Sequence, residues 1–212
     1  MKRGARREGV LKTAGIIVEG DAEYAAFPLL HTRKLLPGCP PIRVTNLGGV
    51  GSHLEPVGIA KRVLSKVIQH QVQQHTPILI CIDREQRSTT ALKLATQVLQ
   101  ELTTLLTKDR RSTSEVGVAI ADRAFEAWLL ADARGLHRKK MFVRGPAFHS
   151  FEGAMGKQQK KGVVELGELL GREYRKTGDG PKLFEKLDFV AARDHGHHGS
   201  VSLDSFLRLL GV

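Results

Sequence analysis

A chain of 212 residues suits one globular domain, or one domain with a small appendage. Hydrophobic residues make up 41% of the chain, as in globular proteins with a sizeable core, yet no apolar run approaches the roughly 18 residues that span a bilayer. The 33 Lys and Arg residues outnumber the 22 Asp and Glu residues, and the formal net charge of +11 favours a polyanionic partner, with nucleic acid ahead of an anionic membrane surface.

The cysteines and the N-terminal residues bear on the compartment of the protein. The two cysteines, Cys39 and Cys81, do not make a disulfide scaffold, and Cys81 lies inside an apolar run. The N-terminal residues are basic, but no apolar stretch follows them as it would in a signal peptide. We therefore expect a cytoplasmic protein without a membrane partner.

Strands and helices are expected to alternate along residues 14–136. The predicted strands cover residues 14–19, 41–47, 77–83 and 115–121, which are largely apolar. The predicted helices cover residues 21–36, 53–74, 88–106 and 125–133, with Ser52 as the N-cap of the second. This alternation predicts an α/β, Rossmann-like fold, in which a parallel sheet of about four strands has helices on both faces.

The composition changes after residue 136. Basic residues, glycines and aromatics without a clear period predict an irregular segment as far as residue 161. Helices are predicted at residues 162–176, 181–187 and 203–210, packed on the sheet domain. The expected parts are a disordered basic N-terminus at residues 1–13, a sheet domain at residues 14–136, and the basic segment with its C-terminal helices at residues 137–212.

Acidic residues follow two of the predicted strands. Glu19 closes the first strand and Glu23 lies four residues later, while Asp83 and Glu85 close the third. Ligands of parallel sheets bind at the carboxyl ends of the strands, so these side chains are expected to converge. Clustered carboxylates repel one another unless they share a cation, and such oxygen ligands suit Mg²⁺ or Mn²⁺. One such pair alone favours a helix cap and a solvated acid, but two pairs favour a metal site.

Three further acids lie near the end of the fourth predicted strand. Glu126 is a candidate fifth metal ligand, although its position also suits ordinary helix surface. Asp122 is a comparable candidate, with capping of the next helix as its alternative role. Asp132 is expected to be a solvated acid at the end of that helix.

Basic residues of the irregular segment could supply the other half of phosphate chemistry. Lys157, Lys160 and Lys161 are candidates to stabilise charge on a phosphate, and Lys157 is taken as the catalytic one. The residues that could follow a nucleic-acid backbone, or form a solvated loop, are Arg138, Lys139, Lys140 and Arg144. Aromatic residues make up only 5% of the chain, which favours contacts to phosphates over base stacking.

Two other motifs look like binding sites, but neither predicts one. Residues 194–198 contain three histidines, but this short glycine-containing run favours a mobile polar loop over a zinc site. The glycines of residues 48–51 lack the Gly-Lys-Ser/Thr ending of a phosphate-binding loop, which argues against nucleotide hydrolysis.

The acidic motifs resemble those of a known domain. Residues 18–23, Val-Glu-Gly-Asp-Ala-Glu, followed by residues 82–85, Ile-Asp-Arg-Glu, resemble the Toprim domain shared by topoisomerases, primases and OLD-type nucleases. The second acid at Glu23 makes the chain more similar to the OLD-type branch. Residues 125–132, Phe-Glu-Ala-Trp-Leu-Leu-Ala-Asp, also resemble a stand-alone Toprim-like family. The resemblance implies acid–base work for Glu19 and Mg²⁺ binding by the later acids, although Glu85 replaces the usual second Asp.

The leading hypothesis is a Mg²⁺-dependent nuclease that hydrolyses phosphodiester bonds in DNA or RNA. Its one or two metal ions would be held by Glu19, Glu23, Asp83, Glu85 and Glu126. The resemblance further implies a separate ATPase subunit in defence against phage. The alternative is a non-catalytic module that binds nucleic acid or a protein partner on a Toprim scaffold, and the sequence leaves the oligomeric state open.

Overall fold

The computed structural model describes residues 12–146, 151–153, 161–194 and 199–212. Within them, four parallel strands form one sheet in the order β2-β1-β3-β4. The strands are β1 (Ala14–Val18), β2 (Ile42–Asn46), β3 (Ile78–Asp83) and β4 (Val116–Ala121). The predicted α/β fold is confirmed, and each strand ends within one residue of its predicted bounds. The disordered N-terminus was predicted at residues 1–13, of which residues 1–11 lie outside the described residues.

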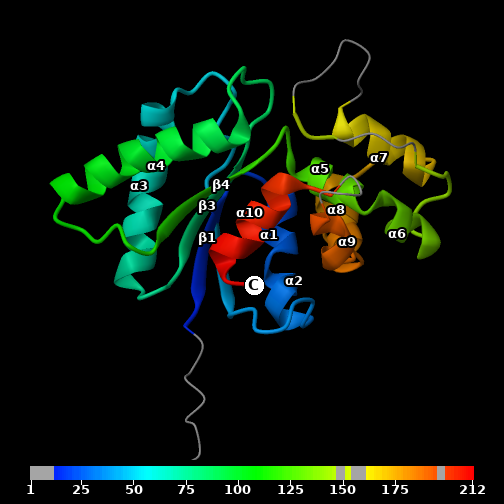
Figure 1. The fold of residues 1–212 in the computed structure, drawn as a ribbon, viewed down its shortest axis with the longest axis horizontal. Coiled ribbons are helices and arrows are strands. Elements are labelled where there is room, and N and C mark those ends of the chain that lie inside the picture. Colours follow the sequence, from blue (N-terminus) through cyan, green and yellow to red (C-terminus); the bar gives the residue numbers. More distant parts are fainter. Residues whose placement is uncertain (1–11, 147–150, 154–160, 195–198) are drawn as a thin grey trace, which may run out of the picture.

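One face of the sheet is covered by α3 (Pro56–Val72) and α4 (Ala91–Lys108), which lie together on the left of Figure 1. Their apolar stripes pack on strand side chains that point to this face, including Ile17, Ile80 and Ile120. The continuous apolar run of β3 follows from its place between β1 and β4, where helices cover both of its faces.

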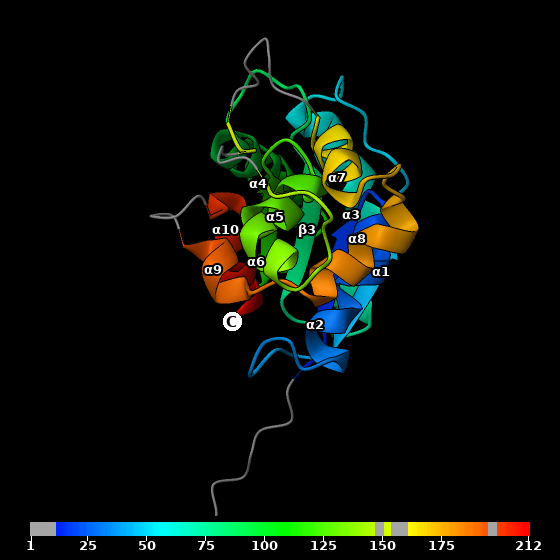
Figure 2. The same ribbon diagram turned by 90° about the vertical axis from the view of Figure 1, so that its right-hand side faces the viewer.

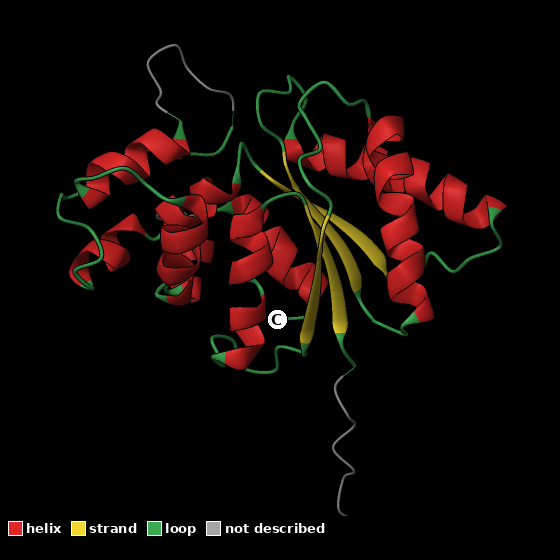
Figure 3. Cartoon of the chain, turned by 180° about the vertical axis from the view of Figure 1, so that it is seen from behind, coloured by secondary structure: helices red, strands yellow, loops and turns green. Residues whose placement is uncertain are grey.

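The opposite face is covered by a second helical layer, and Figure 3 shows the sheet lying between the two layers. The helices of this layer nearest the sheet are α1 (Asp21–Ala26), α2 (Pro28–Thr32), α5 (Phe125–Ala131) and α10 (Val201–Leu210). The helices farther out are α6 (Ala133–Arg138), α7 (Gly162–Leu170), α8 (Lys176–Glu185) and α9 (Phe189–Arg193) (Figures 1 and 2).

An aromatic cluster holds the second layer together. The ring of Phe27, between α1 and α2, stacks on Phe206 of α10 with centroids 4.8 Å apart and on Trp128 of α5 with centroids 6.0 Å apart. Trp128 Nε1 also donates a hydrogen bond to Ser202 Oγ at 2.6 Å. Buried aromatic pairs add to the free energy of apolar burial. The cluster therefore fixes α5 against helices that are distant in sequence.

Two predictions about helix starts in the first half were wrong. The helix predicted at residues 21–36 is two short helices, because Pro28 has no N–H to continue the hydrogen bonds of α1 and instead begins α2. Ser52 does not cap a helix. Pro56 occupies the first turn of α3, where a missing N–H costs nothing, and Glu55 is the N-cap.

The C-terminal helices also differ from their predicted bounds. The helix predicted at residues 125–133 is α5, and a separate helix, α6, follows Asp132. The helix predicted at residues 162–176 ends before Gly171, whose φ of 68° lies in the left-handed region that terminates helices. α8 begins before Pro181, and α9 was not predicted. No helix of the described ranges is both long enough and apolar enough to cross a membrane.

Candidate acidic centre

The carboxyl ends of β1 and β3 bring two predicted acids to the same edge of the sheet. Val18, the last residue of β1, pairs with Cys81 of β3. Glu19, the residue after β1, therefore lies beside the last residues of β3, which ends at Asp83. Asp83 Oδ1 accepts a hydrogen bond from Phe125 N at 3.0 Å, which brings the start of α5 to this edge as well.

Two helices add buried carboxylates to this edge. Glu23 of α1 is 5% exposed, and Glu126 of α5 is 2% exposed. The charge of Glu126 acts on both Glu23 and Asp83, and the charge of Glu23 acts on Glu19. Four predicted residues thus form one group of interacting charges, which we call the acidic centre: Glu19, Glu23, Asp83 and Glu126.

Burial and mutual repulsion raise the pKa values of three of these carboxyls, those of Glu19, Glu23 and Asp83. Loss of hydration is the larger cause, and with the charges of Glu85 and Glu23 it raises the pKa of Glu19 to about 7. Burial followed by the charge of Glu126 raises the pKa of Glu23 to about 6. Burial and the neighbouring carboxylates also hold the pKa of Asp83 well above its ordinary range. A shared cation would relieve this repulsion.

Glu85 lies on the Glu19 side of the acidic centre, since its charge acts on Glu19. Its φ of 52° lies in the left-handed region, which is uncommon for a residue with a side chain. Its backbone N–H donates to Arg123 O at 2.6 Å, so the conformation is held by a contact to the segment after β4. The predicted Glu85 thus joins the group from the loop that follows β3.

A lysine that was not predicted faces the other side of the acidic centre. Lys176 Nζ lies 3.7 Å from Glu126 Oε1. The charges of Glu126, Asp83 and Glu23 raise the pKa of Lys176 and keep it positively charged. Lys176 begins α8, which packs against α1. No local motif marked this residue, because it reaches the centre only through the packing of two helices distant in sequence.

Three polar atoms in and beside the site are buried without a hydrogen-bond partner among the described residues: Glu19 Oε2, Arg87 Nε and Tyr174 Oη. Tyr174 is 5% exposed, and burial followed by the charges of Glu126 and Glu23 raises the pKa of its hydroxyl. A buried polar atom without a partner costs about 1–3 kcal/mol. A cation bound at the acidic centre would supply a partner for Glu19 Oε2.

Arg87 connects the acidic centre to the loop after β2. Its Nη2 donates to Gly51 O at 2.5 Å and its Nη1 donates to Asp83 O at 3.1 Å. Its positive charge lowers the pKa of Glu19, against the effect of burial. Arg87 was not predicted as a site residue, although it lies only four residues beyond Asp83.

Asp122 and Asp132 have structural roles. The carboxylate of Asp122 pairs with the guanidinium of Arg84 and accepts a hydrogen bond from Gly153 N at 2.8 Å, rather than capping α5. The prediction that Asp132 is a solvated acid was wrong. Asp132 is 4% exposed, caps α6, and accepts a hydrogen bond from Asp188 N at 2.8 Å. Packing of α9 over this helix end explains its burial.

The predicted basic segment is only partly described. Lys157 and Lys160 lie outside the described residues, as do residues 195–198 of the histidine-containing run. Lys161 is the N-cap of α7, without a side-chain capping bond. Arg138, Lys139, Lys140 and Arg144 are exposed. Arg138 ends α6 and the other three follow it, at the outer end of the second helical layer (Figure 1).

The donor atoms of the acidic centre suit a hard divalent cation. They are carboxylate oxygens, and Glu19 Oε2 lacks a partner among the described residues. No three His, Cys, Asp or Glu side chains in the described part of the chain are already arranged around a common point as a metal site. The chemistry of the centre therefore fits Mg²⁺ or Mn²⁺, whereas a complete ligand set is not preassembled.

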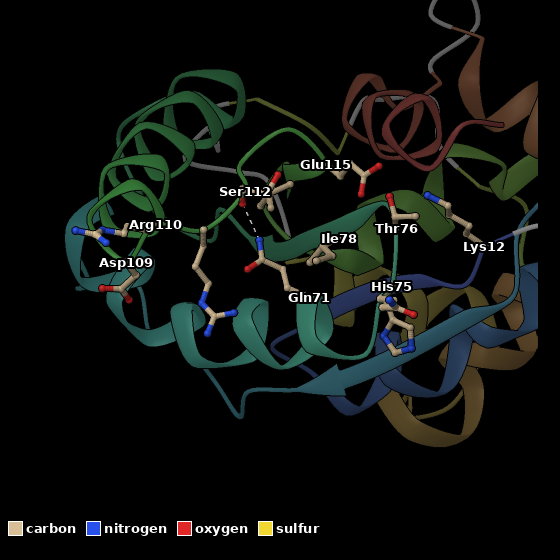
Figure 4. Close-up of a pocket in the computed structure, with 12 residues that line it drawn as sticks. Lys12, Gln71, His75, Thr76, Ile78, Asp109, Arg110, Ser112 and Glu115 are labelled. Carbon is tan, nitrogen blue, oxygen red and sulfur yellow. Dashed lines mark hydrogen bonds between the residues drawn. The ribbon is translucent and has the colours of Figure 1, made fainter.

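A separate cavity of about 610 Å³ lies at the opposite ends of the strands, where β3 and β4 begin (Figure 4). A hydrogen bond from Gln71 Nε2 to Ser112 O, 2.6 Å long, joins its two walls. Figure 4 shows Lys12 and His75 toward one end of the cavity and Arg110 toward the other. No residue of the acidic centre lines this cavity, so the cavity and the acidic centre are separate features of the molecule.

Comparison with known proteins gives one match. A family model described as a domain of unknown function (DUF4276) matches residues 18–206 of the chain. The match runs from the end of β1 into α10 and includes the whole acidic centre. No curated protein and no solved structure matches the chain.

Proposed function

This chain belongs to the DUF4276 family, and we propose that it is a Mg²⁺- or Mn²⁺-dependent nuclease that hydrolyses phosphodiester bonds in DNA or RNA. The observation that carries the proposal is the electrostatic interaction of four carboxylates near the carboxyl edge of the sheet, where burial and repulsion raise the pKa values of Glu19, Glu23 and Asp83. Such a group is stabilised by a divalent cation. The net charge of +11 on the whole chain favours the approach of a polyanionic substrate.

The residues that would hold the cation are Glu19, Glu23, Asp83 and Glu126, with Glu85 beside Glu19. A bound divalent cation would polarise a phosphoryl oxygen and activate a water molecule. Lys176 keeps a positive charge beside Glu126, where it is suited to stabilise negative charge that develops on the phosphate. Glu19, with a pKa of about 7, is suited to accept a proton near neutral pH.

A non-catalytic module that binds nucleic acid is the second candidate function. One observation favours it, namely that the described residues contain no three ligands already arranged around a common point. This module would bind nucleic acid through the positive net charge of the chain without cutting it. For the leading proposal, the resemblance to OLD-type nucleases further implies that a separate ATPase subunit binds this chain and that the two act in phage defence.

A cleavage assay separates the two functions. Plasmid DNA, single-stranded DNA and single-stranded RNA are incubated with Mg²⁺ or Mn²⁺ and with the wild type, Glu19→Gln or Asp83→Asn. We expect metal-dependent cleavage that falls at least about 10²-fold in each variant. Glu173→Gln, which removes one exposed carboxylate outside the centre, is the matched control and should cut like the wild type. Cleavage that survives both substitutions would rule out the acidic centre as the reactive site.

A further inference from the structure

The edge strand β2 presents a polar face beside α3. β2 is the first strand in the sheet order, and α3 lies over β1 and β3. Val44 packs in the core of the second helical layer, and side chains alternate along a strand, so Arg43 and Thr45 point toward α3. Thr45 Oγ1 lies 3.1 Å from Nε2 of His70 in α3, which agrees with this direction.

The side of α3 that faces β2 is basic. Arg62, Lys66 and His70 are spaced four residues apart and therefore share one face of the helix. Residues 42–82 contain four Lys or Arg residues and a single acid, Glu55. Positive charge on this face is therefore almost unopposed by carboxylates of the same stretch.

The pKa values of two histidines, His70 in α3 and His75 just after it, are lowered in part by this positive charge. Burial is the main cause that lowers the pKa of His70 to about 4, and the charges of His75, Arg43 and Lys66 lower it further. Nδ1 of His70 lies 2.7 Å from Nδ1 of His75, whose pKa is also lowered, by burial and by Arg43. Arg43 of β2 and Lys66 of α3 thus lie close enough to act on the same buried ring.

The loop after β2 contacts both the basic face and Arg87, which acts on the acidic centre. Arg62 Nη2 lies 3.4 Å from Gly48 O, in the loop after β2, and an added Cβ at Gly48 or Gly49 would meet no atom within 4 Å. The same loop accepts the hydrogen bond of Arg87 at Gly51. Since the charge of Arg87 acts on Glu19, an open glycine loop joins the basic face to the acidic centre.

We propose that Arg43, Arg62 and Lys66, which we call the β2–α3 basic surface, bind the phosphate backbone of a nucleic acid whose adjoining segment enters the acidic centre. From Arg43 to Gly48 the chain advances roughly 16 Å at about 3.3 Å per residue, which matches about five base pairs of a duplex measured along its axis at about 3.4 Å each. Residues 42–124 contain no Phe, Trp or Tyr to stack on bases, so binding is expected to be independent of sequence. The inference rests on the proposed function for its account of the acidic centre.

Binding without metal tests the surface apart from the chemistry. Fluorescence anisotropy in EDTA measures the affinity of the full chain for labelled 20-nucleotide duplex DNA, single-stranded DNA and single-stranded RNA over a range of salt concentrations. The test variant is Arg43→Gln/Arg62→Gln/Lys66→Gln. The control variant, Lys34→Gln/Lys108→Gln/Lys186→Gln, removes three exposed charges elsewhere. Circular dichroism checks that both variants fold.

The test variant should bind at least about tenfold more weakly at 0.1 M salt. Its log affinity should also depend less steeply on log salt, with the magnitude of the negative slope smaller by about 2.7 for duplex or about 2.1 for single strands. The nucleic acid with the largest change identifies the substrate class. An equal loss in the control variant, or no loss in the test variant, overturns the proposed surface even if the wild type cuts DNA. A specific loss in a protein that never cuts with Mg²⁺ or Mn²⁺ supports the surface and refutes the proposed nuclease.

Discussion

Replacing Glu19 by Gln should make the metal-free protein more stable at neutral and higher pH. In the folded chain the pKa of Glu19 is raised from 4.5 to about 7, by burial first and then by the charges of Glu85 and Glu23. At about 1.4 kcal/mol per pH unit, this difference corresponds to roughly 3 kcal/mol. The side chain is partly exposed and therefore screened by solvent, so we expect an effect of about 1–2 kcal/mol.

The direction of this stability change follows from proton binding by Glu19. Between pH 4.5 and about 7 the folded state keeps the Glu19 proton that the unfolded chain has released. Stability conferred by this carboxyl is therefore complete below pH 4.5 and is lost as the pH rises through about 7. The amide of Glu19→Gln carries no charge at any pH, so the variant and the wild type should be equally stable in acid and diverge as the pH rises.

Urea unfolding in EDTA between pH 4.5 and 8 measures this divergence, with Glu173→Gln as the control for loss of an exposed carboxylate. Added Mg²⁺ at about 100 times its Kd should stabilise the wild type by about 2.7 kcal/mol, and the variant by much less. If the free energies of unfolding of the wild type and Glu19→Gln change with pH in the same way, Glu19 is not buried among repelling carboxylates. Equal stabilisation of both by Mg²⁺ would place the metal elsewhere.

Two further substitutions test residues beside the acidic centre, and a third tests the start of α10. Lys176→Met should lower single-turnover cleavage about 10²-fold, because it removes the cation 3.7 Å from Glu126, and unchanged cleavage would remove the lysine from the mechanism. Tyr174→Phe should leave the free energy of unfolding in urea unchanged or raise it by up to about 1 kcal/mol, since the hydroxyl has no partner among the described residues. A decrease above about 2 kcal/mol would contradict this expectation. Glu152→Gln should lower the free energy of unfolding by about 2 kcal/mol, because the carboxylate accepts two backbone N–H groups at the start of α10, whereas exposed Glu173→Gln should change it by less than about 0.5 kcal/mol.

The strands and their acidic ends could be predicted because both depend on local pattern. The apolar run of β3 predicts a central strand, and parallel strands present their carboxyl ends at one edge. That rule alone brings Glu19 and Asp83 together before any tertiary contact is known. Glu126 was harder, because its role depends on how α5 leaves β4, and the hydrogen bond from Phe125 N to Asp83 fixes that direction.

The residues that escaped prediction depend on contacts between segments distant in sequence. Lys176 and Tyr174 reach the acidic centre because the segment that begins α8 packs against α1. Asp132 resembles a solvated helix end until α9 covers it through Asp188. Pro28 is different, since its missing N–H was visible in the sequence and should have divided the first predicted helix.

The central claim is that the acidic centre binds a divalent metal, and anomalous diffraction from crystals soaked in Mn²⁺ tests it most directly. We predict an anomalous peak within about 2.0–2.6 Å of carboxylate oxygens of the acidic centre, including Glu19 or Asp83. The peak should be absent from crystals of Glu19→Gln/Asp83→Asn soaked in the same way. A wild-type crystal with Mn²⁺ bound only at other carboxylates, or a peak that persists in the double variant, would contradict the account.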